Sequence, residues 1–340
     1  MRIELPISKS IANRLLILQA IHGDGLMTVS CDMPDDVRIM SEAIRLLGER
    51  REARIDLGNC GTAMRFLTAY CAQLEGQTTI LDGVERMHHR PIGQLVDALR
   101  EIGADIEYLG EEGFPPLRIK GCILDKRRIV TINNPQSTQF VSALLLIGAN
   151  VQTDSTSPYI YITQEVIKQY QLSPFSYHLS VEKDWSSAAF WYEYVALHGG
   201  EITLPGLSRD SLQGDKVVAD IFAHLGVSTQ YTEEGIRIYR SQAILNSKFL
   251  IQNFSACPDL YPAVALTCER LGVELHATGV ESLPLKESDR LRAVREHRTD
   301  ADHRMAMALL IAGYEVDDTA CISKSYPSFI EHFRHINSLK

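Results

Sequence analysis

The sequence predicts an α/β protein of two domains, and three observations lead to that interpretation. The chain has 340 residues, which is more than one ordinary hydrophobic core holds. Six short polar segments each run directly into a strongly apolar segment of helical length. Between them, an amphipathic helix followed by a strand, a turn and a second strand occurs twice. Helices and strands that recur in this order indicate an α/β architecture built by duplication.

The six polar segments have the composition of helix N-termini. Ser, Asn and Asp recur in them, and these side chains accept hydrogen bonds from the free N–H groups of a first helical turn. A helix that is apolar nearly all round is buried, so only its polar start can face a cleft. Each start offers free N–H donors and about half a positive charge. Where such starts share a cleft, we expect a site for a small polyanion. The segments are 8–14, 59–65, 134–139, 182–187, 255–259 and 300–304.

The second recurring feature is an amphipathic helix followed by a β-hairpin. A glycine ends each of these helices, and a Gly-containing turn separates the two strands. The first copy comprises the helix 95–103, the strand 104–108, the turn 110–113 and a strand through 118–119. The second copy comprises the helix 217–226, the strand 227–231, the turn 232–235 and the strand 236–239.

Two other repeats are too short to contain this hairpin. The helix that ends at Gly48 is followed within seven residues by Ile55, and the helix 290–297 leads directly to Thr299. Loss of an edge hairpin would expose sheet and helix faces elsewhere. We therefore expect chain breaks near 48–55 and 296–302, with residues missing from the numbering, and we regard 151–157 as a similar place. The alternative is that this protein has lost the hairpins.

Composition indicates a globular protein that binds neither membranes nor nucleic acid. Hydrophobic residues make up 45% of the chain but form only short runs, so no membrane span is predicted. The net charge of -9 argues against a nucleic-acid partner, which requires a basic face. The N-terminus lacks a hydrophobic signal segment, so we expect a cytoplasmic location. The seven cysteines include no CxxC pair, which favours reduced, buried thiols over disulfides or a metal site.

Charged residues cluster at several of the predicted helix starts. The run 286–290 is the densest, and it lies at a strand–helix junction, where ligands of α/β proteins gather. A solvated helix start is the alternative interpretation of this run. His303 and Arg304 begin a helix that is too apolar for the surface, and this pairing favours anion binding over packing alone.

A further cationic run, residues 86–90, precedes a helix with Pro91 well placed for its first turn. The adjacent His88 and His89 point in different directions, so we predict no metal site.

Gly61 permits close approach of the backbone to an anion. Its segment lacks the Gly-Lys-Ser/Thr ending of a nucleotide-binding loop, so ATP is not expected. No GxGxxG or GxSxG motif occurs in the chain.

Together these segments resemble the 5-enolpyruvylshikimate-3-phosphate (EPSP) synthase family, also called 3-phosphoshikimate 1-carboxyvinyltransferases. The likeness runs from Leu5 to the C-terminus. The motifs that carry it are LPISKSIANR at 5–14, LGNCGTAMRFL at 57–67, RMHHRPIG at 86–93, STQF at 137–140, SPYI at 157–160, PD at 258–259, KESDRL at 286–291, DHRMAM at 302–307 and KSYP at 324–327. The chain departs from the family pattern at Ile7, Cys60, Phe66 and Ser282, and it lacks the basic residue before Pro158.

This resemblance implies a two-domain inside-out α/β barrel of the enolpyruvyl transferase type. Each domain would contain three βαβαββ repeats around buried helices, and the family closes its domains on the substrates. Residues 9–182 would form an inserted domain with most of the shikimate 3-phosphate site. Residues 1–8 and 183–340 would form the second domain, with the acid and base carboxylates and part of the phosphoenolpyruvate site.

The resemblance also implies a reaction and the residues that perform it. The enolpyruvyl group of phosphoenolpyruvate would move to the 5-hydroxyl of shikimate 3-phosphate by addition and elimination, with release of phosphate. Asp259, Glu287 and Lys9 match the catalytic residues of the family. The residues matching the phosphoenolpyruvate site are Lys9, Gly61, Arg90, Gln139, Arg290, His303, Arg304 and Lys324. Those matching the shikimate 3-phosphate site are Ser10, Arg14, Ser137, Thr138, Gln139, Tyr159, Ser282 and Lys286.

The chemistry implied by the family needs no cofactor and no metal. We expect a monomer whose only partners are its two small-molecule substrates. Two alternatives stay open. The related transferase that acts on UDP-N-acetylglucosamine uses a reactive loop cysteine, whereas Cys60 lies within a glycine turn. A catalytically inactive homologue is the other alternative, although every acid, base and cation expected of the catalytic and phosphoenolpyruvate-binding residues is present.

Overall fold

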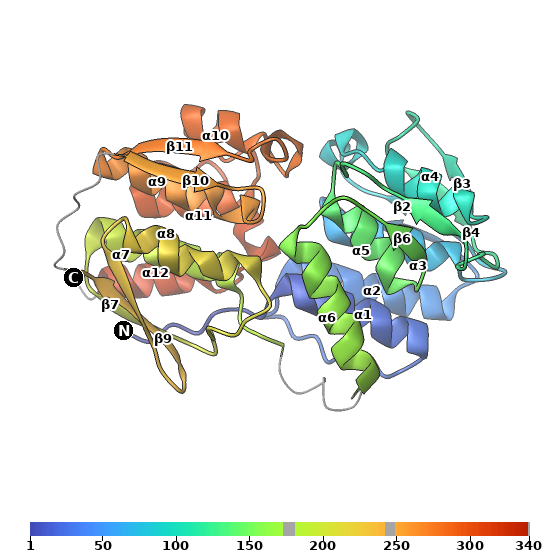
Figure 1. Cartoon of the computed structure of the whole chain (residues 1–340), viewed down its shortest axis with the longest axis horizontal. Helices are drawn as coiled ribbons and strands as arrows, with labels where there is room; N and C mark the ends of the chain where they lie inside the picture. Colours follow the sequence, from blue (N-terminus) through green and yellow to red (C-terminus); the bar gives the residue numbers. More distant parts are fainter. Residues whose placement is uncertain (173–180, 242–248, 339–340) are drawn as a thin grey trace. The chain divides into compact units, whose positions relative to one another are not determined.

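The structure is a computed structural model, and it describes residues 1–172, 181–241 and 249–338. The chain divides into two compact units. Unit 1 consists of Met1–Ser8, Asp32–Asp35 and Glu182–Lys340, and unit 2 consists of Lys9–Cys31 and Asp36–Val181. Each unit is a mixed α/β structure in which helices pack against small sheets (Figure 1).

Unit 2 contains the first half of the secondary structure. Its helices are α1 (Lys9–His22), α2 (Asp35–Glu49), α3 (Gly61–Ala72), α4 (Gly93–Glu101), α5 (Thr138–Leu146) and α6 (Pro158–Leu172), with the short 3-10 helix η1 (Glu85–His89). Its strands are β1 (Glu52–Asp56), β2 (Thr78–Asp82), β3 (Asp105–Tyr108), β4 (Leu117–Lys120), β5 (Ile129–Thr131) and β6 (Asn150–Gln152).

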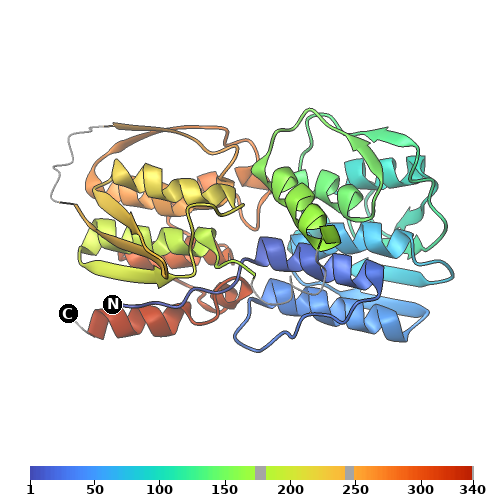
Figure 2. The ribbon, with the colours of Figure 1, turned by 60° about the horizontal axis from the view of Figure 1, so that its bottom comes forward.

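The core of unit 2 forms where α1, α3 and α5 pack on one another. These helices begin at three of the predicted polar segments, and nearly all residues of α3 are buried. A four-stranded sheet has the order β1-β2-β4-β3, in which β1 and β2 are parallel and the β3–β4 hairpin is antiparallel. Strands β5 and β6 form a separate parallel pair. Helix α6 packs on α1, as the view in Figure 2 shows.

Unit 1 contains the second half. Its helices are α7 (Trp185–His198), α8 (Val218–Ala223), α9 (Tyr261–Leu271), α10 (Arg290–Glu296), α11 (His303–Ala312) and α12 (Phe329–Ser338). Its strands are β7 (Glu201–Pro205), β8 (Val227–Tyr231), β9 (Gly235–Arg240), β10 (Phe249–Asn253) and β11 (Glu274–Thr278). The 3-10 helices are η3 (Gly214–Val217), η4 (Pro258–Leu260), η5 (Leu283–Leu285) and η6 (Ala320–Lys324).

The core of unit 1 repeats the plan of unit 2, with α7, α9 and α11 packed on one another. Every residue of α7 from Trp185 to Ala196 is buried, which agrees with its apolar sequence. The sheet order is β7-β9-β8, and Arg2 adds a parallel bridge to Thr203 of β7. Strands β10 and β11 are parallel and lie over α9 (Figure 1). The six buried helices and the two predicted helix–hairpin units are therefore confirmed.

The predicted chain breaks are wrong, because the chain is continuous at both places. Helix α2 ends at Glu49 and β1 begins at Glu52, and the Arg51 carbonyl accepts a hydrogen bond from the Thr78 amide at 2.9 Å. Between α10 and α11, His297, Asp300 and Ala301 adopt left-handed φ angles of 51°, 46° and 57°. These turns allow six residues, 297–302, to connect the two helices without a hairpin. The stretch 153–157 likewise leads directly from β6 into α6.

Loss of a hairpin was expected to leave apolar side chains exposed, and such side chains are present on the two-stranded sheets. Ile129 of β5 is 52% exposed, and Phe249 and Ile251 of β10 are 54% and 68% exposed. Strand residues of this type are normally covered. The chain therefore tolerates exposed apolar side chains on its two-stranded sheets.

Candidate functional site

Unit 1 gathers acidic and basic side chains at the starts of its buried helices. Asp259 lies in η4, directly before α9, and Lys286 and Glu287 lie between η5 and α10. Arg290 begins α10, and His303 and Arg304 begin α11. Lys324 is the last residue of η6. Helix N-termini favour anions through their free N–H groups, and here they also carry cationic side chains.

Asp259 is surrounded by three cations. Its Oδ1 lies 2.8 Å from Arg290 Nη1 and 3.5 Å from Lys286 Nζ, and its Oδ2 lies 3.0 Å from Arg304 Nη2. Burial alone would raise the pKa of this carboxyl. The charges of Arg304, Lys286 and Arg290 together outweigh that effect and hold its pKa well below the usual range. Asp259 is therefore an ionised carboxylate at neutral pH.

Arg290 connects the carboxylates of this site. Its side chain is 1% exposed, and Nε donates to Asp302 Oδ2 at 2.8 Å. Nη1 contacts Asp259, and Nη2 lies 3.1 Å from Glu287 Oε2. Burial would lower the pKa of the guanidinium, but the charges of Asp302, Asp259 and Glu287 raise it. A buried arginine with these partners fixes the positions of three carboxylates at once.

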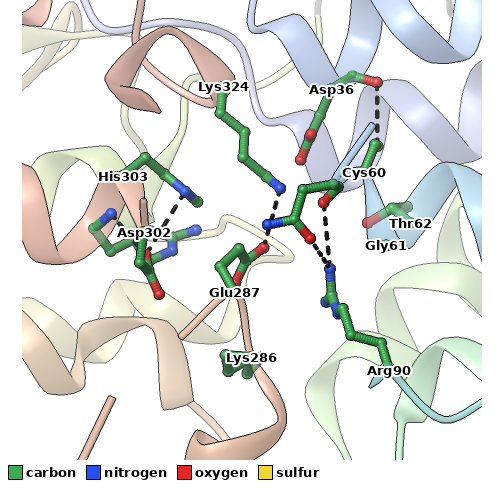
Figure 3. A network of polar contacts seen from close by, with 12 residues as sticks. Asp36, Cys60, Gly61, Thr62, Arg90, Lys286, Glu287, Asp302, His303 and Lys324 are labelled. Atoms are coloured by element: carbon green, nitrogen blue, oxygen red, sulfur yellow. Dashed lines mark hydrogen bonds and ion pairs between the residues drawn. The ribbon is translucent and has the colours of Figure 1, made fainter. Parts of the chain in front are cut away.

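Glu287 makes a second contact to a cation, because Lys324 Nζ lies 3.5 Å from its Oε1 (Figure 3). The Glu287 side chain is 10% exposed and that of Lys324 is 12% exposed. Two cations thus flank a partly accessible carboxyl group. Such a group is suited to accept or donate a proton near an anionic ligand.

Asp302 organises the start of α11. Its side chain caps the helix by accepting the Arg304 amide at 2.9 Å, and it also accepts from Ser288 Oγ at 3.2 Å. His303 is fully buried beside it, with Nδ1 3.8 Å from Asp302 Oδ1 (Figure 3). Ser282 immediately precedes η5, and Lys286 immediately follows it. Seven of the eight predicted site residues of unit 1 are therefore joined by contacts around Arg290, namely Asp259, Lys286, Glu287, Arg290, His303, Arg304 and Lys324.

Unit 2 carries the second group of predicted residues. Lys9 at the start of α1 forms an ion pair with Asp36 at 2.8 Å, and the Asp36 side chain is 4% exposed. Arg14, one turn further along α1, is 2% exposed. Its nitrogens donate to Thr163 Oγ1 at 2.7 Å, to Ser142 Oγ at 3.2 Å and to two backbone carbonyls.

Arg14 is a buried cation whose hydrogen-bond acceptors are uncharged oxygens. The carbonyls that it reaches belong to Ser10 and Tyr159, so it joins the first turns of α1 and α6. Its guanidinium also lies over the Phe66 ring, 5.3 Å from the centroid. Burial lowers the pKa of Arg14 to about 10. The guanidinium remains charged at neutral pH and can attract an anion.

Gly61 begins α3 where two arginines converge. A Cβ at this position would lie 2.6 Å from Arg90 Nη2 and 2.7 Å from Arg65 Nη1. Arg90 Nη1 is 3.3 Å from both the carbonyl and the side-chain oxygen of Asn59 (Figure 3). Only glycine leaves room for both guanidinium groups beside the free N–H groups of the helix.

The start of α5 provides the remaining polar groups. Ser137 is the N-cap of this helix and accepts the Gln139 amide at 3.3 Å. Gln139 Nε2 donates to Thr62 Oγ1 at 2.9 Å, which joins the first turns of α5 and α3. Thr138 is the first residue of α5, and Tyr159 is the second residue of α6.

Several residues of these two groups were absent from the predicted set. Asp36 pairs with Lys9, Asp302 holds Arg290, and Phe66 lies against Arg14. The sequence did contain a signal for Asp302, because an Asp directly before a buried helix is a strong N-cap. No local signal identifies the partner of Lys9 or the ring over Arg14, since both contacts join segments that are distant in sequence.

The histidine pair contacts acidic residues of its own neighbourhood. His88 Nε2 lies 2.9 Å from Asp82 Oδ1, and His89 Nε2 lies 3.1 Å from Glu85 Oε1. Within the described ranges, no group of three or more His, Cys, Asp or Glu side chains is placed to hold a metal ion. The same ranges contain no helix that is both long enough and apolar enough to span a membrane.

An α/β fold with arginines and lysines at helix N-termini around buried carboxylates defines an enzyme that acts on small anions by acid–base chemistry. The family model of EPSP synthase (3-phosphoshikimate 1-carboxyvinyltransferase) matches residues 1–173, 147–297 and 294–333. The chain belongs to the EPSP synthase family.

Individual relatives agree with this assignment. The 3-phosphoshikimate 1-carboxyvinyltransferase of Bacteroides fragilis is 38% identical over 394 positions, which cover 98% of this chain and 94% of the relative. That of Cellvibrio japonicus is 31% identical and covers 99% and 96%. The solved EPSP synthase of Acinetobacter baumannii superposes with a TM-score of 0.68 at 19% identity, covering 98% and 95%.

The alignment lengths also bear on the short connections. The alignment with the Bacteroides fragilis relative spans 394 positions, whereas this chain has 340 residues. The relative therefore contains segments with no counterpart here. This difference agrees with direct connections between elements in place of hairpins.

Proposed function

We propose that this protein transfers the enolpyruvyl group of phosphoenolpyruvate to the 5-hydroxyl of shikimate 3-phosphate. The products are 5-enolpyruvylshikimate 3-phosphate and inorganic phosphate. The family assignment and the named activity of the relatives support this reaction. The observation that carries it in this chain is the Asp259 carboxylate, which three cations keep ionised.

The chemistry requires a base at the attacking hydroxyl. As the hydroxyl oxygen bonds to C2 of phosphoenolpyruvate, its proton moves to Asp259 and a second proton reaches C3. A tetrahedral intermediate results. The C2–O bond to phosphate then breaks, and C3 loses a proton to restore the double bond. Glu287 has the partly accessible carboxyl and the flanking cations that suit the proton transfers at C3.

Cationic groups bind the substrates and stabilise the negative charge that develops. We assign phosphoenolpyruvate to Lys9, Gly61, Arg90, Gln139, Arg290, His303, Arg304 and Lys324. We assign shikimate 3-phosphate to Ser10, Arg14, Ser137, Thr138, Gln139, Tyr159, Ser282 and Lys286. The buried charge of Arg14 supports this second assignment, because its hydrogen-bond acceptors carry no charge to neutralise it. Arginine can bind phosphate or carboxylate through two parallel hydrogen bonds.

Finer features of the architecture are also part of this proposal. We propose an inside-out α/β barrel with three βαβαββ repeats in each domain, from which two hairpins have been lost. Residues 9–182 form the inserted domain, and residues 1–8 with 183–340 form the domain with the acid and base carboxylates. We also propose a cytoplasmic monomer. None of the seven cysteines forms a disulfide in the described ranges, which supports a reducing compartment. Light scattering after gel filtration tests the monomer.

A phosphate-release assay with both substrates tests the activity. We expect release to require shikimate 3-phosphate, and mass spectrometry should detect the enolpyruvyl ether product. The Glu287→Gln variant keeps the size of the side chain and should lower kcat by roughly 10²-fold or more. Phosphate release with UDP-N-acetylglucosamine in place of shikimate 3-phosphate would support the related transferase. A folded wild-type protein that releases no phosphate with either acceptor would be a catalytically inactive homologue.

A further inference from the structure

A second carboxyl group, that of Asp215, is buried near Asp259 in unit 1. Asp215 lies in η3 and is 4% exposed. Its Oδ2 accepts a hydrogen bond from Ser186 Oγ in the first turn of α7. Its Oδ1 is buried and has no hydrogen-bond partner among the residues that the structure describes. A buried carboxyl oxygen that accepts no hydrogen bond destabilises the folded protein when the carboxyl is ionised.

The fold places Asp215 within electrostatic range of Asp259. Helix α7 packs against both η3, which carries Asp215, and η4, which carries Asp259. Burial and the negative charge of Asp259 raise the pKa of Asp215 to about 7. Two carboxyls that repel each other in a buried site titrate far apart, and here Asp259 keeps its charge while Asp215 takes the proton.

Titratable and polar groups from several elements surround or act on Asp215. Helix α7 contributes Ser186 in its first turn and Asp184 as its N-cap, and the charge of Asp184 raises the Asp215 pKa further. The η4 segment contributes Asp259 and its preceding Cys257, whose own pKa rises to about 12 on burial.

Helix α11 contributes Arg304, whose charge lowers the pKa of Asp215. Its Nη2 donates to Asp259 at 3.0 Å. Its Nη1 is buried without a hydrogen-bond partner in the described part of the chain. The donor and the acceptor that lack partners thus belong to two residues whose charges interact.

We infer that Asp215 is a positioning residue for the proposed reaction, and that its charge sets the basicity of Asp259. This inference rests on the proposed function. Electrostatic coupling is reciprocal, so an ionised Asp215 raises the proton affinity of Asp259 as much as Asp259 raises that of Asp215. Asp259 alone, held by three cations, is a weak base. An ionised Asp215 partly offsets those cations and makes Asp259 better able to accept the hydroxyl proton.

The test compares pH profiles of kcat between pH 5.5 and 9 at saturating substrates. In the wild type, kcat should rise by about threefold or more as Asp215 ionises near pH 7, since a tenfold stronger base gives roughly the square root of that gain in rate. The Asp215→Asn variant keeps the shape of a protonated carboxyl. It should retain the low-pH rate and lose the rise. The phosphate groups of the substrates titrate equally in both proteins, so the difference isolates Asp215.

A second variant covers the case in which Asp215→Asn does not fold. The Ser186 hydroxyl favours the ionised form of Asp215. Ser186→Ala should therefore move the rise in kcat to higher pH while the plateau rates stay unchanged. A rise of the same size and position in all three proteins would overturn the inference, as would an equal loss of rate at every pH in Asp215→Asn. If the wild type releases no phosphate at any pH, the proposed function itself fails.

Discussion

Replacing Glu193 with glutamine should stabilise the protein, and the gain should grow as the pH rises. Glu193 lies in α7, in the middle of the hydrophobic core of unit 1, and is fully buried. Neither of its carboxyl oxygens has a hydrogen-bond partner among the described residues. Burial raises the pKa of this carboxyl well above its ordinary value. The folded protein therefore holds a neutral glutamic acid in its core.

The sign of the pH effect follows from proton linkage. The unfolded chain releases the Glu193 proton near pH 4.3, whereas the folded chain retains it to a higher pH. The contribution of this group to the free energy of unfolding is fully present below pH 4.3 and falls as the pH rises toward the folded pKa. In that window the loss is about 1.4 kcal/mol for each pH unit. Glutamine does not titrate, so the variant avoids this loss.

Urea unfolding between pH 4.5 and 8 measures the difference. The free energy of unfolding of Glu193→Gln minus that of the wild type should increase by about 1.4 kcal/mol per pH unit until the folded carboxyl ionises. Glu111 is exposed in the turn of the β3–β4 hairpin, so Glu111→Gln provides a matched control. That control should stay within about 0.5 kcal/mol of the wild type.

Two results would refute this reasoning. One is a stability difference between Glu193→Gln and the wild type that does not change with pH, because the carboxyl would then ionise equally in both states. The other is a Glu193→Gln variant that is less stable than the wild type at pH 8. That result would indicate that the Glu193 carboxyl is ionised in the folded protein and that neighbouring groups stabilise its charge.

Three further substitutions test the site. Asp259→Ala should lower kcat by roughly 10²-fold or more while the protein stays folded, since a general base is lost; near-normal kcat would remove this residue from the mechanism. Gly61→Ala should raise the KM for phosphoenolpyruvate, because its methyl group would lie 2.6 Å from Arg90 Nη2; an unchanged KM would mean that Arg90 does not bind that substrate. Lys9→Met should lower both kcat and the free energy of unfolding, the latter by roughly 3 kcal/mol, because it removes the cation paired with the buried Asp36; urea unfolding beside the activity assay separates the two effects.

The helices and hairpins were predictable because their signals are local. An Asn, Ser or Asp before an apolar run marks the start of a buried helix wherever it lies in the chain. The strand 227–231 was predicted at the bounds that β8 has. The repeat of helix and hairpin led to a wrong prediction at 48–55 and 296–302, because this chain contains no hairpin at either place. Left-handed residues such as His297 and Ala301 close the gap instead, and side chains other than Gly and Asn give little warning of that conformation.

The sequence by itself determined the residue types that this chemistry requires and the helix starts that carry them. Only the tertiary structure decided which charges meet. Arg290 contacts Asp259, Glu287 and Asp302 at once, and these residues come from three different segments of the chain. The burial of Glu193 and Asp215 is likewise a property of packing. Local propensity depends on neighbours in sequence, whereas the pKa of a carboxyl depends on water and charge within a few ångströms in space.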